Sequence, residues 1–491
     1  MLRLPRWFSP RRPDRPKPAR GVVFTDETRG STFLADALRG CAPSLAAPLP
    51  EDPARFRAEM PEGLARFELA RRLDPGGRDI AASLARWSRA HLALRGEDGE
   101  APLVTSLQRT DGQAAALRLV AAPTARCPAG LRLPWQGISL RGAEAVARVE
   151  ALHAEHQLDD GARDGLVGLL GREAPPPLAG ERFAVLGAAA ELAPTELLLE
   201  AGADVLWIDR ASPEPWLAEQ LADRPYAGRL FSPAAPTCLL EQPEAVLAAV
   251  SAFCHGRADG LEGHRRVHLG AFAYAPGAGR ELRLAGSMEA IAHVLGPERL
   301  ASFSTYVSPT TPSAVSPRDR RESERRAGAL PAWQKALRRI GALGAAPWVA
   351  DGPLAIATAA VPMQGPSYQA AQYLTKMMAC EALAASGAVR VSANVAGITA
   401  TRSLEHPLFQ TAFAGARHFG VQVFEPASSR ALSGLLMLSD LFGPPSTGPR
   451  SVHGGVASLP FRLDETIRAG ALVGLATRPS LLGGFVTGRG R

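Results

Sequence analysis

The first third of the chain alternates short apolar runs with amphipathic stretches of helical period. Apolar residues that recur every three or four positions indicate helices, and short apolar runs bounded by turn residues indicate strands. The predicted elements, in chain order, are a strand at 22–24, mostly helical structure at 50–95, strands at 101–108 and 115–122, and an amphipathic helix at 142–158. Strands interleaved with helices predict an α/β unit.

A proline-rich segment at 172–183 separates this unit from a second α/β series. Residues 181–210 have the dimensions of a strand, turn, helix and strand, which is a βαβ unit. The later predicted elements are strands at 266–276, 353–362 and 388–397, a long helix at 367–385 and a helix near 429–441. This series predicts a Rossmann-like doubly wound parallel sheet. A polar, then strongly charged insertion at 305–350 lies between its strands, where it can act as a lid.

The composition is that of a globular protein with more than one core. Of 491 residues, 46% are hydrophobic and 21% are charged. The net charge is +7, but the first twenty residues hold seven basic residues against one acidic residue, a net +6. The rest of the chain is nearly neutral, which excludes the concentrated basic surface of a nucleic-acid-binding protein. No apolar run reaches the roughly 18 residues of a membrane-spanning helix.

The basic N-terminal arm is rich in proline and has no apolar segment of the signal-peptide kind. We expect it to be disordered, with attachment to a membrane surface or an acidic partner as the alternative. The expected organisation is a basic arm at 1–20, an N-terminal α/β lobe of Rossmann-like type at 21–172, a dinucleotide-binding domain at 180–450 and a C-terminal segment at 451–491.

Cysteine and histidine patterns point to no metal or disulfide site. The five cysteines are scattered without a CxxC pair, which excludes a disulfide framework and a zinc site and fits a reducing cytoplasm. His153 and His156 form an HxxH pattern with no third ligand in view, so a solvated helix face is the better interpretation. Cys254 and His255 adjoin in sequence, but chain neighbours rarely form a nucleophile–base pair. The hydroxyl-rich segment 308–312 is either a proline-stiffened surface loop or the lining of a substrate cleft.

A turn of small residues, 187–194, follows the first strand of the second series. Small residues let the backbone approach a pyrophosphate, and the helix after the turn offers N–H groups to phosphates. The turn has one glycine rather than three, so an ordinary strand-to-helix turn is the alternative. The candidate cofactor-binding residues of this turn are Gly187, Ala188, Glu191 and Leu192.

An acidic residue at the end of the next predicted strand strengthens the cofactor hypothesis. Asp209 is spaced from Gly187 as expected for a carboxylate that accepts hydrogen bonds from the adenosine ribose, which favours NAD. Arg210 follows immediately and can instead pair with the 2′-phosphate of NADP. The sequence therefore predicts NAD or NADP without deciding between them.

Three later features, in order, resemble the short-chain dehydrogenase/reductase family. Thr358 ends a predicted strand, Tyr368 opens the next helix, and the following strand runs into Ala-Gly-Ile-Thr-Ala-Thr. The resemblance spans roughly 180–402. It implies that Thr358 orients the substrate oxygen and that Tyr368 donates the proton. It also implies that Gly397 and Thr401 belong to the loop that holds the nicotinamide amide.

The helix that begins near Tyr368 departs from the family pattern at one position. The family has a lysine four residues after the tyrosine, and this chain has Gln372 there. A neutral amide cannot lower the pKa of the phenol as a cation does. Lys376 lies one helical turn further on and is the alternative source of positive charge.

These observations predict an NAD(P)-dependent oxidoreductase that transfers hydride between nicotinamide and a carbonyl or alcohol in a small-molecule or acyl-type substrate. The alternative is a non-catalytic Rossmann-like protein that binds or scaffolds, because fold does not fix function. Helix 367–385 is apolar over more than one face, and the corresponding family helix forms a dimer interface. We therefore also expect a homodimer.

Overall fold

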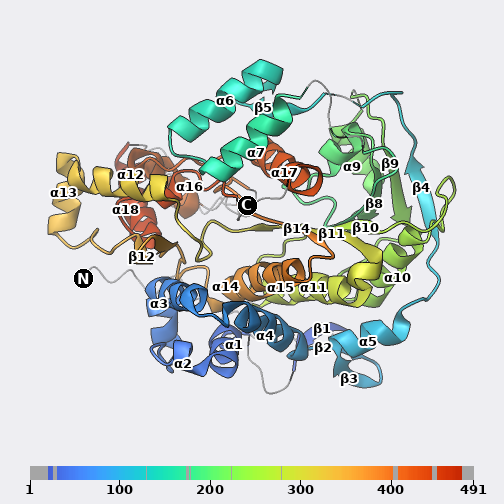
Figure 1. The fold of residues 1–491 in the computed structure, drawn as a ribbon, viewed down its shortest axis with the longest axis horizontal. Helices are drawn as coiled ribbons and strands as arrows, with labels where there is room; N and C mark the ends of the chain where they lie inside the picture. The colour runs from blue at the N-terminus through green and yellow to red at the C-terminus, as the bar shows by residue number, and fades with distance from the viewer. Residues whose placement is uncertain are drawn as a thin grey trace.

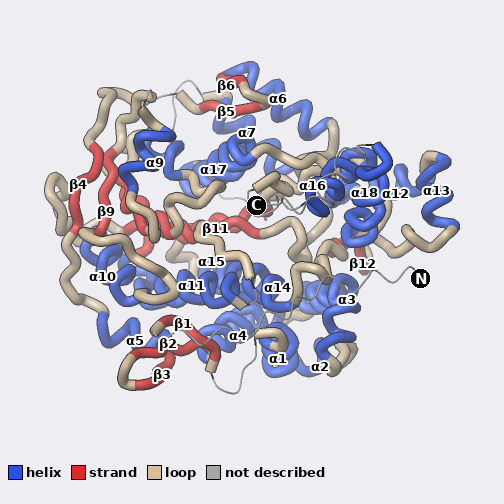
Figure 2. The backbone as a smooth tube through the Cα atoms, turned by 180° about the vertical axis from the view of Figure 1, so that it is seen from behind, coloured by secondary structure: helices blue, strands red, loops and turns tan. Residues whose placement is uncertain are grey.

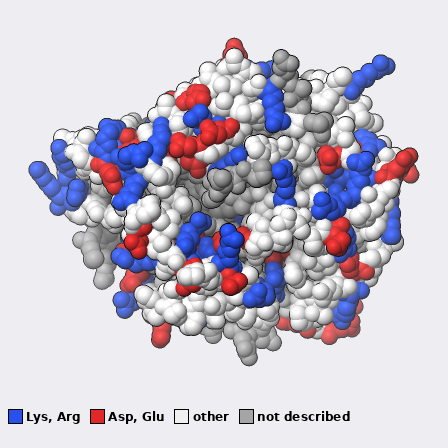
Figure 3. Space-filling model, viewed as in Figure 1, with Lys and Arg blue, Asp and Glu red and all other residues white. Residues whose placement is uncertain are grey.

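The computed structural model describes residues 20–25, 30–128, 130–172, 176, 178–222, 224–277, 279–401, 407–444 and 450–477 (Figure 1). Nearly all of the basic arm and the last part of the expected C-terminal segment therefore lie outside the described residues. Among the described helices, none is both long enough and apolar enough to cross a membrane. On the face seen in Figure 3, basic and acidic side chains are interspersed rather than gathered into one basic stripe.

A seven-stranded sheet forms the centre of the fold. Its order is β14-β11-β10-β7-β8-β9-β4, with six parallel strands and β4 antiparallel at one edge. The strands are β4 Leu117–Ala121, β7 Arg182–Leu186, β8 Asp204–Ile208, β9 Arg229–Pro233, β10 Val267–Ala271, β11 Leu300–Val307 and β14 Arg390–Val395. Numbered along the chain, the parallel strands lie 3-2-1-4-5-6, which is the Rossmann order. The predicted Rossmann-like parallel sheet is confirmed.

Helices cover both faces of the central sheet (Figure 1). One face carries α9 Pro213–Gln220 and α17 Pro426–Phe442, with α6 Gly142–Ala154 and α7 Asp160–Leu170 outside them. The short helix α8 Thr195–Glu200 packs in the same hydrophobic cluster as α17. The other face carries α10 Pro243–Cys254, α11 Arg280–Arg299 and a composite helix formed by α14 Pro366–Gln372, the π-helical turn η2 Tyr373–Met378 and α15 Ala379–Ala385. Every residue of β7, β8 and β10 is buried, because helices cover both faces of the sheet. This burial accounts for the mostly apolar sequences of the three strands.

Residues 20–110, the N-terminal layer, pack on the outside of α11 and the composite helix. This layer contains β1 Gly21–Phe24, α1 Phe33–Cys41, α2 Pro43–Ala46, α3 Pro53–Leu73, α4 Gly77–Ala90, β2 Leu92–Gly96, β3 Gly99–Pro102 and α5 Leu103–Thr110. The strands β1, β2 and β3 form an antiparallel sheet. Figure 2 shows this small sheet below α11 when the molecule is viewed from behind.

The prediction of a second Rossmann-like lobe at 21–172 is wrong. Its strands are antiparallel, β4 belongs to the central sheet, and β5 Arg132–Trp135 pairs with β6 Ile138–Arg141 as a hairpin. The strand predicted at 101–108 is also wrong. That segment is mostly α5, in which Leu103, Ser106 and Leu107 are buried at helical spacing.

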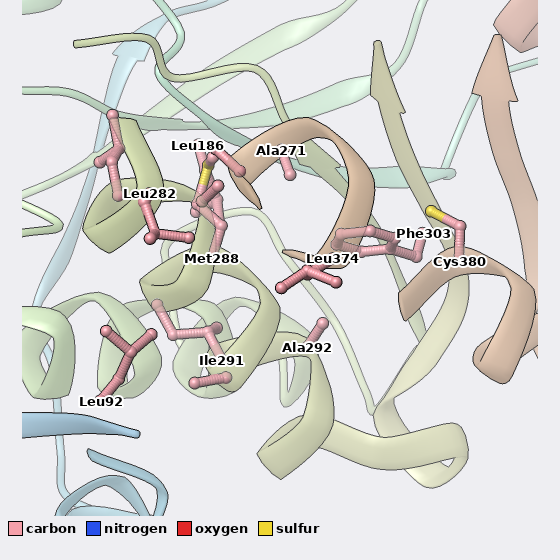
Figure 4. Packing of buried hydrophobic residues seen from close by; sticks show 14 of the residues in the cluster. Leu92, Leu186, Ala271, Leu282, Met288, Ile291, Ala292, Phe303, Leu374 and Cys380 are labelled. Carbon is pink, nitrogen blue, oxygen red and sulfur yellow. The ribbon is translucent and has the colours of Figure 1, made fainter. Parts of the chain in front are cut away.

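The N-terminal layer shares its core with the central sheet. Side chains of β2, β7, β10, α11, β11 and the composite helix meet in one hydrophobic cluster, part of which is drawn in Figure 4. There Leu92 of β2 lies beside Ile291 of α11, and Leu374 of η2 lies near Phe303 of β11. A second cluster lies on the opposite face of the sheet, between α17 and helices α7 and α8.

The chain between β11 and α14 forms a separate small unit with the C-terminal part of the chain. It contains α12 Pro317–Gly328, α13 Ala332–Arg339 and the hairpin of β12 Trp348–Asp351 with β13 Leu354–Ala357. These pack with α16 Pro407–Ala416, the short turns η4 Arg417–Phe419 and η5 Val456–Ser458, and α18 Leu463–Thr477. The strand predicted at 353–362 is therefore outside the central sheet, and the insertion extends beyond 350 to the start of α14.

Candidate functional site

The turn after β7 lies at the point where the strand order reverses, next to β10. Gly187 has a φ of +82°, a conformation that favours glycine. A Cβ at this position would lie 2.3 Å from Cα of Ala273, the residue that follows β10 closely. Gly187 is thus required by the packing of two protein segments, whether or not a ligand binds.

The N–H groups at the start of this turn are already hydrogen bonded within the protein. Gly187 and Ala188 donate to the carbonyl of Ile208, and Ala190 donates to the carbonyl of Gly187. The Ala189 N–H donates to a carboxylate oxygen of Asp209 at 3.0 Å. In addition, α8 begins only at Thr195 and is six residues long. The turn therefore differs from a phosphate cradle of unpaired N–H groups at a helix N-terminus.

Asp209 and Arg210 follow β8, as the sequence predicted, but they behave differently. The second carboxylate oxygen of Asp209 accepts from the N–H of Ala211 at 3.1 Å, so the carboxylate is held by two backbone donors. Arg210 is exposed. The structure thus presents an oriented carboxylate and an exposed guanidinium side by side.

The guanidinium of Arg430, on α17, lies beside the end of the turn near Glu191. Arg430 donates to the carbonyl of Glu191 at 3.1 Å and pairs with Glu196 at 3.3 Å. Leu192 packs against the cluster on that face of the sheet. Three arginines (Arg132, Arg224 and Arg430) surround the two carboxylates of Glu196 and Glu200. These arginines are thus engaged with carboxylates of α8, and Arg430 also contacts the backbone of the turn.

Thr358 does not lie at the end of a central strand. It follows β13 in the hairpin, is 2% exposed, and donates its hydroxyl to the carbonyl of Ala346 at 2.7 Å. The assignment of Thr358 as the active-site hydroxyl is therefore wrong. A buried strand of a hairpin and a buried strand of the central sheet have the same apolar pattern, so the sequence of this segment does not distinguish them.

The hydroxyl at the end of the fifth parallel strand belongs to Ser308. This residue directly follows β11, and its hydroxyl lies near enough to the Tyr368 phenol to lower the pKa of that phenol. Its hydroxyl also contacts that of Thr310 at 2.8 Å. The sequence left 308–312 as either a proline-stiffened surface loop or a cleft lining, and the apolar run that ends at Val307 is the signal that could have placed Ser308 at a strand end.

Tyr368 lies on the first turn of α14 at the C-terminal edge of the sheet. Burial raises the pKa of its phenol, the Ser308 hydroxyl offsets part of this rise, and the negative charge of Glu281 adds to it. At neutral pH the phenol is therefore protonated. It can donate a proton, and it is a poor base.

Gln372 bridges two elements instead of facing a ligand. Its Oε1 accepts from the N–H of Ser308 at 3.0 Å, and its Nε2 lies 3.5 Å from a carboxylate oxygen of Glu281. The side chain is 3% exposed. Gln372 thus ties the end of β11 to the start of α11 and fixes the position of Ser308.

Lys376 projects from η2 toward Glu281. Its Nζ lies 3.6 Å from the Glu281 carboxylate and donates to the carbonyl of Tyr306 at 3.3 Å. Burial raises the pKa of Glu281, while Lys376 and the N–H of Ala275 oppose that rise. Lys376 therefore lies near Gln372, and its ammonium group pairs with the carboxylate of Glu281.

The loop after β14 is held by the segment that precedes α17. A Cβ on Gly397 would lie 2.4 Å from the Phe424 ring and 2.9 Å from the Val452 carbonyl oxygen. The N–H of Thr401 donates to the carbonyl of Thr399 at 2.9 Å. Gly397 is thus needed for packing, and the loop lies beyond the carboxyl end of β14 as the resemblance implied.

The other candidates have structural roles. His153 contacts Asp160 at 2.7 Å and His156 contacts Asp319 at 3.4 Å, and both rings are mostly covered rather than solvated. The thiol of Cys254 donates to the carbonyl of Arg265 at 3.0 Å, and burial raises its pKa. Within the described ranges, no group of three or more histidine, cysteine or acidic side chains is arranged to hold a metal ion.

The chain matches no protein-family model, and no curated protein matches it significantly.

Proposed function

We propose that the chain is an NAD(P)-dependent oxidoreductase of the short-chain dehydrogenase/reductase type. The observation that carries this proposal is the proximity of Ser308 and Tyr368 at the carboxyl end of the fifth parallel strand in a sheet of Rossmann order. Ligands of such sheets bind outside the carboxyl ends of the strands, beside the switch point. The pair lies at that edge.

The proposed reaction is the transfer of hydride between nicotinamide and the carbonyl carbon of a small-molecule or acyl-type substrate. The cofactor supplies the hydride chemistry when it is bound. Ser308 donates a hydrogen bond that orients the carbonyl oxygen, and Tyr368 donates the proton that this oxygen gains. Gln372 holds Ser308, and Arg430 and the small residues of the Gly187 turn face the phosphates.

The second candidate function is non-catalytic binding or scaffolding by a Rossmann-like protein. The observation that favours it is the engagement of Gly187, Ala188, Ala189 and Ala190 in internal hydrogen bonds, which leaves fewer donors for phosphates. The two functions differ in whether a dinucleotide binds at all.

Titration of the full chain with NADH and with NADPH, followed by nicotinamide fluorescence, separates the two. The oxidoreductase proposal requires saturable binding of at least one cofactor, weakened by Arg430→Gln because a phosphate loses its cation. Arg320→Gln, on the surface of α12, is the matched control. Failure of both cofactors to bind at millimolar concentration would leave only the scaffolding function.

The expected cytoplasmic setting and homodimer belong to the same proposal. In one chain, however, α4 packs on η2 and α15 and α1 packs on α14, so the N-terminal layer already covers the helix that was expected to dimerise. We therefore propose that any homodimer uses a different surface.

A further inference from the structure

The helix α13, within the insertion between β11 and α14, lies at the periphery of the molecule, well away from the central sheet (Figures 1 and 2). Only one side of α13 is covered. Gln334 is buried, Leu337 packs against the hydrophobic cluster of the insertion, and the ring of Trp333 contacts that of Phe419. The other side chains of α13 are exposed, so most of the surface of this helix is open.

The exposed cations of α13 have no acidic partner. Arg338 and Arg339 follow Lys335 by three and four positions, so the three side chains are neighbours on the helix surface. Among the described residues none of the three forms an ion pair, and the sequence has no Asp or Glu from 325 to 350. Figure 3 shows Lys and Arg side chains at the edge of the molecule where α13 lies. Like charges at this spacing repel one another in water, and an anionic surface relieves that repulsion.

Exposed apolar side chains lie on another side of the same helix. Trp333, Ala336 and Ile340 are three and four positions apart, which places them next to one another. Trp333 is 37% exposed, and Ile340, at the C-cap, is 72% exposed, the most of any large apolar side chain among the described residues. Single exposed apolar residues are common on protein surfaces, but here an indole and an isoleucine flank a group of unpaired cations.

This combination fits the surface of an anionic bilayer. A helix that lies in the membrane interface places apolar and aromatic side chains at the boundary of the acyl chains, and its Lys and Arg side chains attract anionic headgroups. An acidic protein would account for the cations but not for the isoleucine and indole beside them. The first twenty residues of the chain carry a net charge of +6 and are attracted to the same kind of surface.

We propose that α13 is a docking helix that holds the protein on the surface of an anionic lipid bilayer. Trp333 and Ile340 enter the boundary between headgroups and acyl chains, and Lys335, Arg338 and Arg339 bind the anionic headgroups. This function is independent of the proposed oxidoreductase activity, because α13 belongs to the insertion and contributes no residue to the central sheet.

Co-sedimentation of the full chain with vesicles tests the role of the cations. Wild type should bind vesicles of phosphatidylcholine that contain phosphatidylserine, should not bind vesicles of phosphatidylcholine alone, and should be released by salt. The triple variant Lys335→Gln/Arg338→Gln/Arg339→Gln should bind the anionic vesicles at least about tenfold more weakly, because each cation near an anionic surface adds to the attraction. Failure of wild type to bind anionic vesicles would overturn the proposal and leave an acidic protein as the partner of α13.

A second triple variant controls for the net charge, which affects all binding to anionic lipid. Arg78→Gln/Arg109→Gln/Arg126→Gln removes the same charge from three exposed arginines on other segments, and it should keep most of the binding. The basic first twenty residues are present in both triple variants. Equal loss of binding in the two would show that charge alone attracts the chain, and would overturn the assignment to α13.

Quenching of tryptophan fluorescence by brominated lipid tests the insertion of the apolar side chains. Trp333→Phe should still bind anionic vesicles but should be quenched less than wild type, and Trp7→Phe is the control for the basic first twenty residues. A loss of quenching confined to Trp7→Phe would place the lipid contact outside α13 and overturn the proposal. Ile340→Ser, a change at an exposed position, should weaken binding with little effect on its salt dependence. Wild-type binding by Ile340→Ser would refute the insertion of this side chain.

Discussion

The Ser308 hydroxyl lies near the Tyr368 phenol and lowers its pKa, although an entire helical and hairpin unit separates the two residues in sequence. Ser308 directly follows β11, and Tyr368 lies in the first turn of α14. The insertion therefore begins and ends at nearly the same place, beside the carboxyl end of β11. Gln372 ties the backbone of Ser308 directly to the composite helix, and the Ser308 hydroxyl contacts Thr310 at the start of the insertion. The pair is therefore held by the Rossmann scaffold together with the start of the insertion.

Substitution of the two candidate hydroxyl residues distinguishes the structural assignment from the sequence-based one. Ser308→Ala should lower turnover about 100-fold, since one donor to the developing oxyanion is lost. Thr358→Val should leave turnover unchanged and reduce stability by about 1 kcal/mol, because its buried hydrogen bond to Ala346 is lost. Rates and urea unfolding of both variants check this, and the reverse pattern of rates would restore Thr358 as the catalytic hydroxyl.

Gly187→Ala should destabilise the fold by at least about 2 kcal/mol even without cofactor, because φ is +82° and Ala273 occupies the space of a Cβ. Gly168→Ala is the control. Gly168 lies within helix α7, where a Cβ meets nothing within 4 Å, so this change should stabilise by about 0.5–1 kcal/mol. Urea unfolding of both variants measures the difference. Full stability of Gly187→Ala would show that the turn can move away from Ala273.

Arg71→Met should destabilise the protein by about 3–5 kcal/mol, because the buried carboxylate of Glu68 would lose a buried cation and keep only Arg72 and the Tyr373 hydroxyl as partners. Arg71 also pairs with Glu381 of α15 at 2.8 Å, so it joins the N-terminal layer to the composite helix. Arg66→Met, which breaks an exposed pair with Glu62 on the same helix, should cost less than about 0.5 kcal/mol. Similar unfolding free energies for the two variants would mean that the layer is held by its apolar contacts alone.

Asp319 should make the fold sensitive to acid. Burial alone would raise the pKa of this carboxyl, but His453, Ser316 and His156 outweigh it and lower the pKa to about 2. A pKa lowered on folding stabilises the protein above the unfolded value near 3.8, and this stability is lost as pH falls toward 2. The loss amounts to about 2 kcal/mol.

Acid unfolding measures this contribution. Asp319→Asn should be less stable than wild type near neutral pH and should lose less stability between pH 4 and pH 2. Asp98→Asn, an exposed change on a turn, is the control and should follow wild type. Parallel acid curves for wild type and Asp319→Asn would contradict the lowered pKa.

The sequence predicted β7, β8, β10 and β14 because these strands are short apolar runs next to predicted helices, but it predicted no strand at β9 or β11. It misplaced β13 because a buried hairpin strand and a buried central strand have the same apolar pattern. It misassigned residues 101–108 because Leu103 and Leu107 were judged by composition rather than by spacing. Local patterns cannot show which sheet a strand joins, so the antiparallel N-terminal layer was also missed.

The candidate site was predicted only in part. Tyr368 was found through its place at a helix start, and Gln372 and Lys376 were identified as departures from the family motif. Their common partner, Glu281, was not predictable, because it lies on a different helix and comes into contact only through the packing of α11 on η2. Gln372 proved to be an acceptor for the Ser308 N–H, so Gln372→Lys would remove that acceptor as well as add a charge.

The most direct test of the oxidoreductase account is the turnover of Tyr368→Phe. Wild type and variant are assayed for oxidation of NADH and NADPH with a small aromatic ketone and with an acetoacetyl thioester, and Tyr226→Phe serves as the control. The account predicts at least a 100-fold loss of turnover in Tyr368→Phe with cofactor affinity almost unchanged, because the phenol acts on the substrate oxygen in the transition state. Full activity of Tyr368→Phe on a substrate that wild type reduces would contradict it.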